Sequence, residues 1–149
     1  MLRVTKLTDY ATVVLTALAA RPDAVLSASE LAELAGLEIP TVAKVLKPLA
    51  QAGLVEGFRG AHGGYRLARP AGDITLVDVV EAMEGPLGMT ECSLHESNCG
   101  IESSCGVRAN WRRINDVVAD ALREVSLADM LSSAPIKSRR SIPATLATA

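Results

Sequence analysis

Residues 29–53 read SELAELAGLEIPTVAKVLKPLAQAG, and this stretch decides how the first half of the chain folds. A short helix is expected to end at Gly36, and Pro40 suits the first turn of a second helix because its ring fixes the φ angle that a helix start needs. The second helix is expected to run to about Ala52. Its buried face is expected to consist of Val42, Val45, Leu46 and Leu49. Two helices joined by a glycine-containing turn predict a helix-turn-helix.

The segment that follows predicts a β-hairpin. Residues 54–59 (LVEGFR) and 65–69 (YRLAR) alternate, and the glycine-rich turn GAHGG separates them. A hairpin attached to a helix-turn-helix is a wing, so the expected fold is mainly α-helical with a small β-hairpin wing. Its two adjacent turn glycines would let the backbone approach a phosphate or the minor groove, although a solvated hairpin with ordinary surface arginines is the alternative. The expected DNA-contacting residues are Thr41, Lys44, Lys47, Arg59, Gly63 and Gly64.

Charge is spread unevenly along the 149 residues. The net charge is −2, but residues 1–70 carry eight Lys or Arg against six Asp or Glu, whereas residues 71–149 carry seven against eleven. A DNA contact must therefore come from a local patch in the first half, where the densest basic group is Arg59, Arg66 and Arg69. No stretch approaches the ~18–20 apolar residues of a membrane span, so we expect a cytoplasmic protein without a membrane partner. The sequence has no nucleophile elbow, P-loop or dinucleotide-binding glycine pattern, so an enzyme is not expected.

Two threonines are expected to begin helices. Thr8 would cap a helix over residues 9–20, with Asp9 in its first turn, where a carboxylate faces the positive end of the helix dipole. Residues 75–84 open with a Thr-x-x-Asp pattern that resembles a capping box, and they predict a further helix.

After residue 108, apolar side chains recur at alternating three- and four-residue steps, which is typical of a helix that packs along one stripe. The stripe consists of Trp111, Ile114, Val118, Ala121 and Val125, widened by Val117 and Leu122. Packing against its own domain would satisfy this stripe, but we favour antiparallel pairing with the same helix of a second chain, because two-fold operators call for dimeric readers. We therefore divide the chain into a winged helix-turn-helix DNA-binding domain (1–84), a cysteine loop (85–108), a long C-terminal dimerisation helix with a short extension (109–131), and a tail expected to be disordered (132–149).

All three cysteines, Cys92, Cys99 and Cys105, lie in a polar, glycine-containing stretch without an apolar period, which predicts a loop. Thiolates select zinc, copper(I) and iron–sulfur clusters, so three of them on one loop indicate a metal or iron–sulfur site. Zinc knuckles usually show two to four residues between cysteines, and the six and five found here do not match that spacing. A redox-sensing thiol site, a disulfide with a spare thiol, and three inert thiols are the alternatives.

The order of these features resembles a known family. Residues 59–65 read RGAHGGY, and this Arg-Gly-x-x-Gly-Gly-Tyr pattern occurs together with the cysteine triplet. Over about residues 1–130 the chain is similar to the bacterial winged-helix iron–sulfur regulators typified by IscR and NsrR, and most closely to the SUF-system iron–sulfur assembly regulators. The resemblance implies a homodimeric DNA-binding transcription regulator whose cluster lies near the dimerisation helix. On this basis we expect a repressor of iron–sulfur cluster assembly genes.

The resemblance also implies a set of cluster ligands, beginning with the three cysteines. IscR-type proteins supply a histidine shortly after the third cysteine, but Arg108 stands there, and a guanidinium cannot ligate iron. NsrR-type proteins use an aspartate near the amino terminus, donated by the partner subunit, and residues 7–9 (Leu-Thr-Asp) match that stretch. We therefore expect Asp9 as the fourth ligand, His95 as its competitor, and a 2Fe-2S rather than a 4Fe-4S cluster. A nitric-oxide- or thiol-based redox-sensing repressor and a zinc-stabilised regulator are the alternatives.

Overall fold

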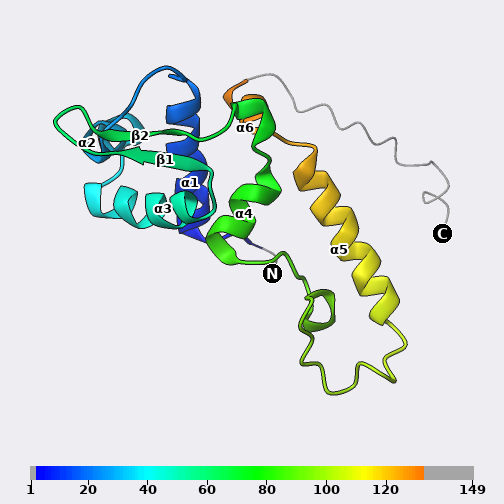
Figure 1. The fold of residues 1–149 in the computed structure, drawn as a ribbon. Coiled ribbons are helices and arrows are strands. Elements are labelled where there is room, and N and C mark those ends of the chain that lie inside the picture. The colour runs from blue at the N-terminus through cyan, green and yellow to red at the C-terminus, as the bar shows by residue number, and fades with distance from the viewer. Residues whose placement is uncertain (1–2, 133–149) are drawn as a thin grey trace.

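The computed structural model describes residues 3–132, which are mainly α-helical with one two-stranded antiparallel hairpin (Figure 1). This confirms the expected fold class. Residues 133–149, within the tail expected to be disordered, lie outside the described residues. In the described part, no helix is both long and apolar enough to cross a membrane. In chain order the elements, with η marking a 3-10 turn, are α1 (Lys6–Ala19), α2 (Ala28–Ala35), α3 (Ile39–Gln51), β1 (Val55–Phe58), β2 (Gly64–Leu67), η1 (Ala71–Asp73), α4 (Leu76–Glu84), η2 (Glu91–Ser93), α5 (Arg108–Arg123) and α6 (Leu127–Leu131).

The helix-turn-helix forms as expected, and local signals set its limits. Ser27 caps α2: its hydroxyl accepts a hydrogen bond from the Glu30 N–H, and the Glu30 carboxylate accepts one from the Ser27 N–H. Gly36 ends α2 at a φ of 65°, a left-handed conformation that glycine adopts without strain. The four apolar residues expected to form the buried face of α3 are each no more than 1% exposed, and they share one core with Leu15 and Leu18 of α1.

The start of α1 differs from the expectation. The helix begins at Lys6, with Thr5 rather than Thr8 as its N-cap. The Thr5 hydroxyl accepts a hydrogen bond of 3.3 Å from the Thr8 N–H, so Thr8 lies inside the first turn, where it is buried. The Thr8 hydroxyl donates instead to the Glu84 carboxylate at the end of α4, 76 positions away. Thr8 is therefore not the cap, because Thr5 caps the helix three residues earlier and the Thr8 hydroxyl bonds to α4.

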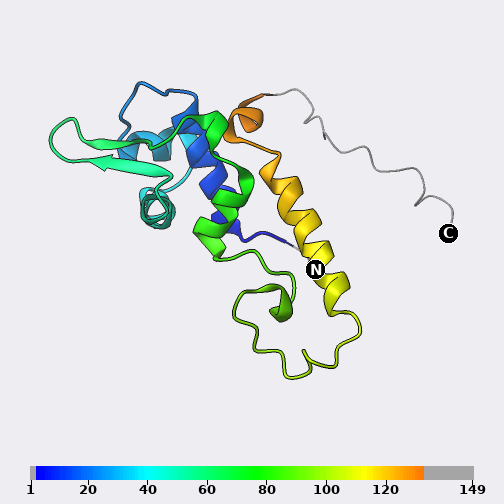
Figure 2. The ribbon, with the colours of Figure 1, turned by 45° about the vertical axis from the view of Figure 1, so that its right-hand side comes forward.

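Strands β1 and β2 form the expected hairpin, in a register that pairs Glu56 with Arg66. The hairpin is fixed to the helices through its second strand, because Tyr65 and Leu26 exchange two backbone hydrogen bonds just before α2. Figures 1 and 2 both show the tip of the hairpin projecting away from α4 and α5. The hairpin therefore occupies the place of a wing beside the helix-turn-helix.

The second half of the chain packs against the first half through α4 and α6. Thr75 and Ser126 each begin a helix with a capping box, and the two residues face each other across an antiparallel bridge. Leu127 in α6 is fully buried in the same core as α1 and α3. Between these anchors, α5 runs beside α4 and the cysteine loop lies beyond the ends of both helices, away from the hairpin (Figure 2). The cysteine loop and the wing are therefore at opposite ends of the molecule.

Candidate DNA interface and cysteine loop

The outer face of α3 carries the three residues expected to contact DNA. Lys44 and Lys47 are exposed, and Thr41 is half-buried near the start of the helix. They project from α3 between the four buried apolar positions, so the same helical period that fills the core leaves them on the surface. This arrangement is compatible with a recognition helix, and the assignment of individual DNA contacts stays a prediction.

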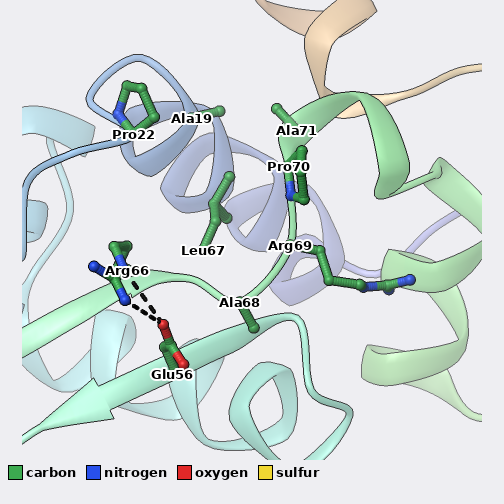
Figure 3. A pocket seen from close by; sticks show the side chains of 9 residues that line it. All are labelled: Ala19, Pro22, Glu56, Arg66, Leu67, Ala68, Arg69, Pro70 and Ala71. Carbon is green, nitrogen blue, oxygen red and sulfur yellow. Dashed lines mark hydrogen bonds and ion pairs between the residues drawn. The ribbon is translucent and has the colours of Figure 1, made fainter.

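The three wing arginines are not equivalent. Arg66 donates hydrogen bonds of 2.7 and 3.3 Å to the Glu56 carboxylate (Figure 3). Its guanidinium carbon lies 5.0 Å from the centre of the Phe58 ring. Arg69 lies 3.6 Å from an oxygen of Asp78. Arg59 is exposed and has no carboxylate partner among residues 3–132. Arg59 is therefore the wing guanidinium most available to a phosphate or a groove.

The two turn glycines are required by the chain's own backbone. A Cβ atom on Gly64 would lie 2.4 Å from the Leu26 carbonyl oxygen, and one on Gly63 would lie 2.4 Å from the Phe58 carbonyl oxygen. Any side chain at either position would therefore force the wing away from the helices or distort its turn. The sequence suggested that these glycines permit a close approach to DNA, but the close approach in the structure is within the protein. Their proposed DNA contact remains untested.

The three cysteines lie along the loop between α4 and α5, and all are free thiols. Cys92 sits in η2 and is 7% exposed, with its sulfur 3.1 Å from the Thr90 hydroxyl oxygen, whereas Cys99 and Cys105 are half-buried. Three unpaired thiols on one short segment are the soft donors that iron–sulfur clusters and zinc prefer, so the chemistry of the loop fits such a group. The alternative of a disulfide with a spare thiol is not formed in this structure.

The predicted ligands do not converge within one chain. Among residues 3–132, no three His, Cys, Asp or Glu side chains gather as a single metal ion requires. Asp9 is exposed on the first turn of α1, and His95 is exposed within the cysteine loop. The structure therefore leaves the predicted donors apart, and their role as ligands stays a prediction.

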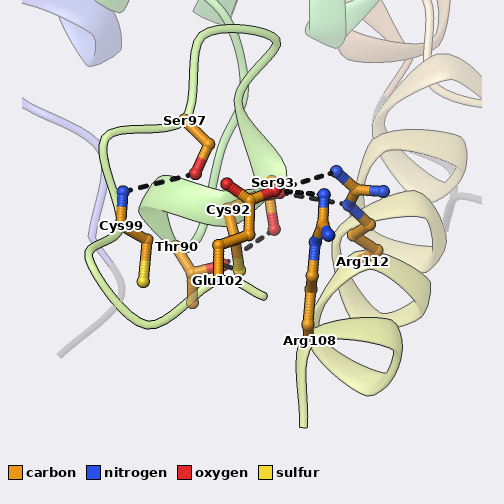
Figure 4. A network of polar contacts seen from close by, with 8 residues as sticks. All are labelled: Thr90, Cys92, Ser93, Ser97, Cys99, Glu102, Arg108 and Arg112. Carbon is orange, nitrogen blue, oxygen red and sulfur yellow. Dashed lines mark hydrogen bonds and ion pairs between the residues drawn. The ribbon is translucent and has the colours of Figure 1, made fainter. Parts of the chain in front are cut away.

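Arg108, the first residue of α5, anchors the cysteine loop to this helix. Its guanidinium forms an ion pair with Glu102, and Arg112, one turn further along α5, lies 3.6 Å from the same carboxylate oxygen (Figure 4). Arg112 also donates a hydrogen bond of 3.1 Å to the Cys92 carbonyl oxygen. The pKa of Glu102 is lowered, first by a hydrogen bond from Ser97 and then by the two arginines. The sequence ruled out Arg108 as a ligand but gave no signal of this anchoring role, because the loop's path cannot be read from residue order.

Helix α5 leaves part of the expected apolar stripe exposed and contacts its own chain with neighbouring positions. Asn115 and Ala119 are buried, and the Asn115 side chain accepts a hydrogen bond of 3.1 Å from the Met89 N–H. The outward face includes three large apolar side chains that the sequence assigned to the stripe or its flank. They are Trp111, Ile114 and Val117, which are 38%, 43% and 50% exposed. A row of exposed apolar groups along one helix is typical of a surface that another protein covers.

Comparisons with known proteins agree with this architecture. The Rrf2 family model, described as an iron-dependent transcriptional regulator, matches residues 4–133. Protein aau3 of Rhizobium meliloti (strain 1021) is 37% identical over 135 residues, which cover 90% of this chain and 88% of that protein. CymR, the global cysteine regulator of B. subtilis, has a solved structure that superposes with a TM-score of 0.70 at 27% identity, covering 91% of this chain and 100% of CymR. IscR of T. potens superposes with a TM-score of 0.64 at 30% identity, covering 87% and 86% of the two chains.

Proposed function

Because the chain belongs to the Rrf2 family of transcriptional regulators, we propose that it is a homodimeric DNA-binding repressor of iron–sulfur cluster assembly genes that senses through a bound cluster. The observation that carries this proposal is the set of three free thiols on one loop, next to a helix with an uncovered apolar face. The family's description as iron-dependent and the likeness to T. potens IscR support an iron-containing group over zinc. The target genes are inferred from the resemblance to SUF-system regulators.

Operator DNA is read by α3 and the wing. In this proposal Thr41 and Lys44 lie near the base edges, and Lys47 lies nearer the DNA backbone. Arg59 and the Gly63–Gly64 turn contact the flanking DNA groove. In a two-fold dimer, the two α3 helices would meet half-sites about 34 Å apart, or a multiple of that distance, on one face of the duplex. The exposed lysines of α3 support this assignment, as does the Arg59 guanidinium, which has no carboxylate partner within residues 3–132.

The cluster ligands are Cys92, Cys99, Cys105 and Asp9 of the partner subunit, with His95 as the competitor for the fourth place. When bound, the group supplies iron that can be oxidised, nitrosylated or lost, and we favour a 2Fe-2S over a 4Fe-4S cluster. A carboxylate is a harder donor than a thiolate, so the fourth position would be the weakest, which suits a sensor. Through these ligands, Asp9 in the first turn of α1 of one chain would be linked to the cysteine loop of the other chain.

The dimer forms through α5. Its exposed Trp111, Ile114 and Val117 would pack antiparallel against the same face of a second copy, which removes three large apolar side chains from water. The cysteine loop is anchored to the first turns of this helix by Arg108 and Arg112. Ligand occupancy on the loop can thus bias how the two subunits, and their α3 helices, are set relative to each other.

The decisive experiment counts iron and acid-labile sulfide per chain after anaerobic reconstitution and measures operator affinity before and after cluster removal. We expect visible sulfur-to-iron absorption, sulfide in the preparation, and different affinities for the two forms. Cys92→Ser should abolish sulfide binding, whereas Asp9→Ala should leave a cluster that is lost faster. A colourless protein that takes up stoichiometric zinc, or equal gel shifts with and without the cluster, would overturn the proposal.

A thiol-based sensor is the second candidate, because the three thiols are free and the fold is shared with a cysteine regulator. In that case oxidants would change operator affinity in iron-free protein, and dithiothreitol would reverse the change. Iron-free protein whose operator affinity does not respond to oxidants would exclude this candidate.

A further inference from the structure

The carboxylate of Glu84, the last residue of α4, fastens the first turn of α1. Its Oε1 atom accepts a hydrogen bond of 2.7 Å from the Thr5 backbone N–H and another of 2.7 Å from the Thr8 hydroxyl. The two threonine hydroxyl oxygens lie 3.0 Å apart, so the three residues form one closed group, which we name the Glu84 clamp. Thr8 is 2% exposed, so its hydroxyl has lost most of its contact with water and needs these partners.

The position of Glu84 is not explained by its own helix. A carboxylate in the last turn of α4 faces the negative end of that helix dipole, which disfavours it. The same carboxylate faces the N-terminus of α1, a helix of 14 residues, where the dipole favours a negative charge and the Thr5 N–H donates its hydrogen bond to Glu84. The contact with α1 therefore accounts for the placement of this charge.

The clamp joins two segments that are distant in the sequence. Asp9 directly follows Thr8 and donates its own N–H to the Thr5 carbonyl, so it belongs to the same helical turn. Gly85 directly follows Glu84 and begins the cysteine loop. A hollow of about 360 Å³ beside Glu84 is lined by Val4, by residues 87–89 and by α5. The segment that precedes α1 therefore also lies near the start of the cysteine loop.

We propose that Glu84 is a positioning residue that couples the first turn of α1 to the start of the cysteine loop. The consequence of this coupling rests on the proposed function. In the proposed dimer, each chain would donate Asp9 to one cluster and its three cysteines to the other cluster. The clamp would then make the two sites of the dimer respond together. Because α1 shares its core with α3, a shift in the first turn of α1 also reaches the helix proposed to read DNA.

The experiment begins with cluster-free protein and measures amide hydrogen exchange at both ends of the clamp. The reporters are Thr5 and Asp9 on α1, and Gly85, whose N–H donates to the Glu81 carbonyl at the end of α4. Thr8→Val removes the hydroxyl with little change in size, and we expect it to accelerate exchange at Gly85 as well as at Thr5, about two- to fivefold. Glu84→Ala should do the same, whereas Thr8→Ser should restore wild-type rates.

The control is Glu33→Gln, which removes an exposed carboxylate from the last turn of α2 and should leave all three reporters unchanged. Faster exchange at Thr5 with no change at Gly85 in Thr8→Val would mean that the contact does not couple the two segments, and the proposal would fail.

The second measurement is the ratio of operator affinities with and without the reconstituted cluster. A merely structural role would alter both affinities and leave their ratio unchanged, whereas we expect Thr8→Val and Glu84→Ala to shrink the ratio about two- to thirtyfold. An unchanged ratio in variants with accelerated exchange would overturn the coupling to DNA binding. A wild-type protein with no such ratio would instead refute the proposed function, while the exchange rates would still decide whether the clamp couples α1 to the loop.

Discussion

Helices α3 and α5 carry the same kind of apolar stripe but meet different surroundings. The four residues of the α3 stripe, Val42, Val45, Leu46 and Leu49, are buried within the chain at no more than 1% exposure. On α5, Trp111, Ile114 and Val117 are 38% to 50% exposed, although this helix also contacts α4 and buries Asn115 and Ala119. The comparison teaches that helical periodicity shows which face must be covered and not which molecule covers it.

The difference separates what one chain can stabilise alone from what needs a second copy. The region around α1 and α3 has a closed core, to which α6 adds Leu127. No residue of the cysteine loop or α5 belongs to this core, and ion pairs and hydrogen bonds join the loop to α5. Changes to α3 should therefore act on the unfolding of each chain, and changes to the outer face of α5 should act on association.

The largest effect is expected from Leu46→Ala in α3. Leu46 is 1% exposed, so the substitution leaves a cavity in the closed core and should lower the free energy of unfolding by about 2–5 kcal/mol. Chemical denaturation measures it. Leu34→Ala, which removes the same atoms from a side chain 45% exposed on α2, should change stability by no more than about 0.5 kcal/mol. Similar losses in the two variants would contradict the closed core.

The next effect concerns α5. Trp111→Ala should weaken self-association by roughly 2 kcal/mol, about thirtyfold in Kd, because a large aromatic at the centre of an interface contributes disproportionately. Sedimentation equilibrium over a range of protein concentrations measures it, with Arg113→Ala on the same helix as the control. If the wild type sediments as a monomer, or if Trp111→Ala leaves the Kd of self-association unchanged, α5 is not the dimer contact.

Much of the fold followed from the sequence because its signals are local. The apolar period of α3, the glycine that ends α2 and the capping box before α4 all act within a few residues, and each is confirmed. Thr8 was assigned wrongly as a cap because Thr5, three residues earlier, takes that role. Its bond to Glu84 could not be predicted, because Glu84 is 76 positions away. The close contact between Gly64 and the Leu26 backbone was likewise not predicted, because Leu26 lies far from Gly64 in the sequence, and the predicted DNA contact of Gly64 stays untested.

The candidate site was less accessible to sequence reasoning. The Glu56–Arg66 pair could have been found, because a hairpin with this turn places the two residues opposite each other. The anchoring of the cysteine loop by Arg108 and Arg112 could not, because the path of an irregular loop of more than twenty residues is set by tertiary contacts.

The wing offers a comparison on a smaller scale, between a free and a paired arginine. Arg59→Ala should reduce the salt dependence of operator binding by about one phosphate contact, because the Arg59 guanidinium is unpaired by carboxylates in the described structure. Arg66→Ala should change that slope less, since Arg66 is already bound to Glu56. Fluorescence anisotropy over a series of salt concentrations measures both. Equal slopes in Arg59→Ala and the wild type would remove Arg59 from the interface.

The smallest effect on stability is expected at the Glu84 clamp, where α4 contacts the first turn of α1. The hydrogen bond from the Thr8 hydroxyl, and then that from the Thr5 N–H, lower the pKa of Glu84 below its ordinary value of 4.5. A carboxyl group whose pKa is lower in the folded than in the unfolded protein stabilises the fold above its unfolded pKa, and this stabilisation is lost as the pH falls through the folded value. The Tm of the wild type should therefore exceed that of Glu84→Gln slightly at pH 7, and the gap should close in acid. A gap that is constant with pH would mean that the Glu84 charge adds nothing to the contact between α4 and α1.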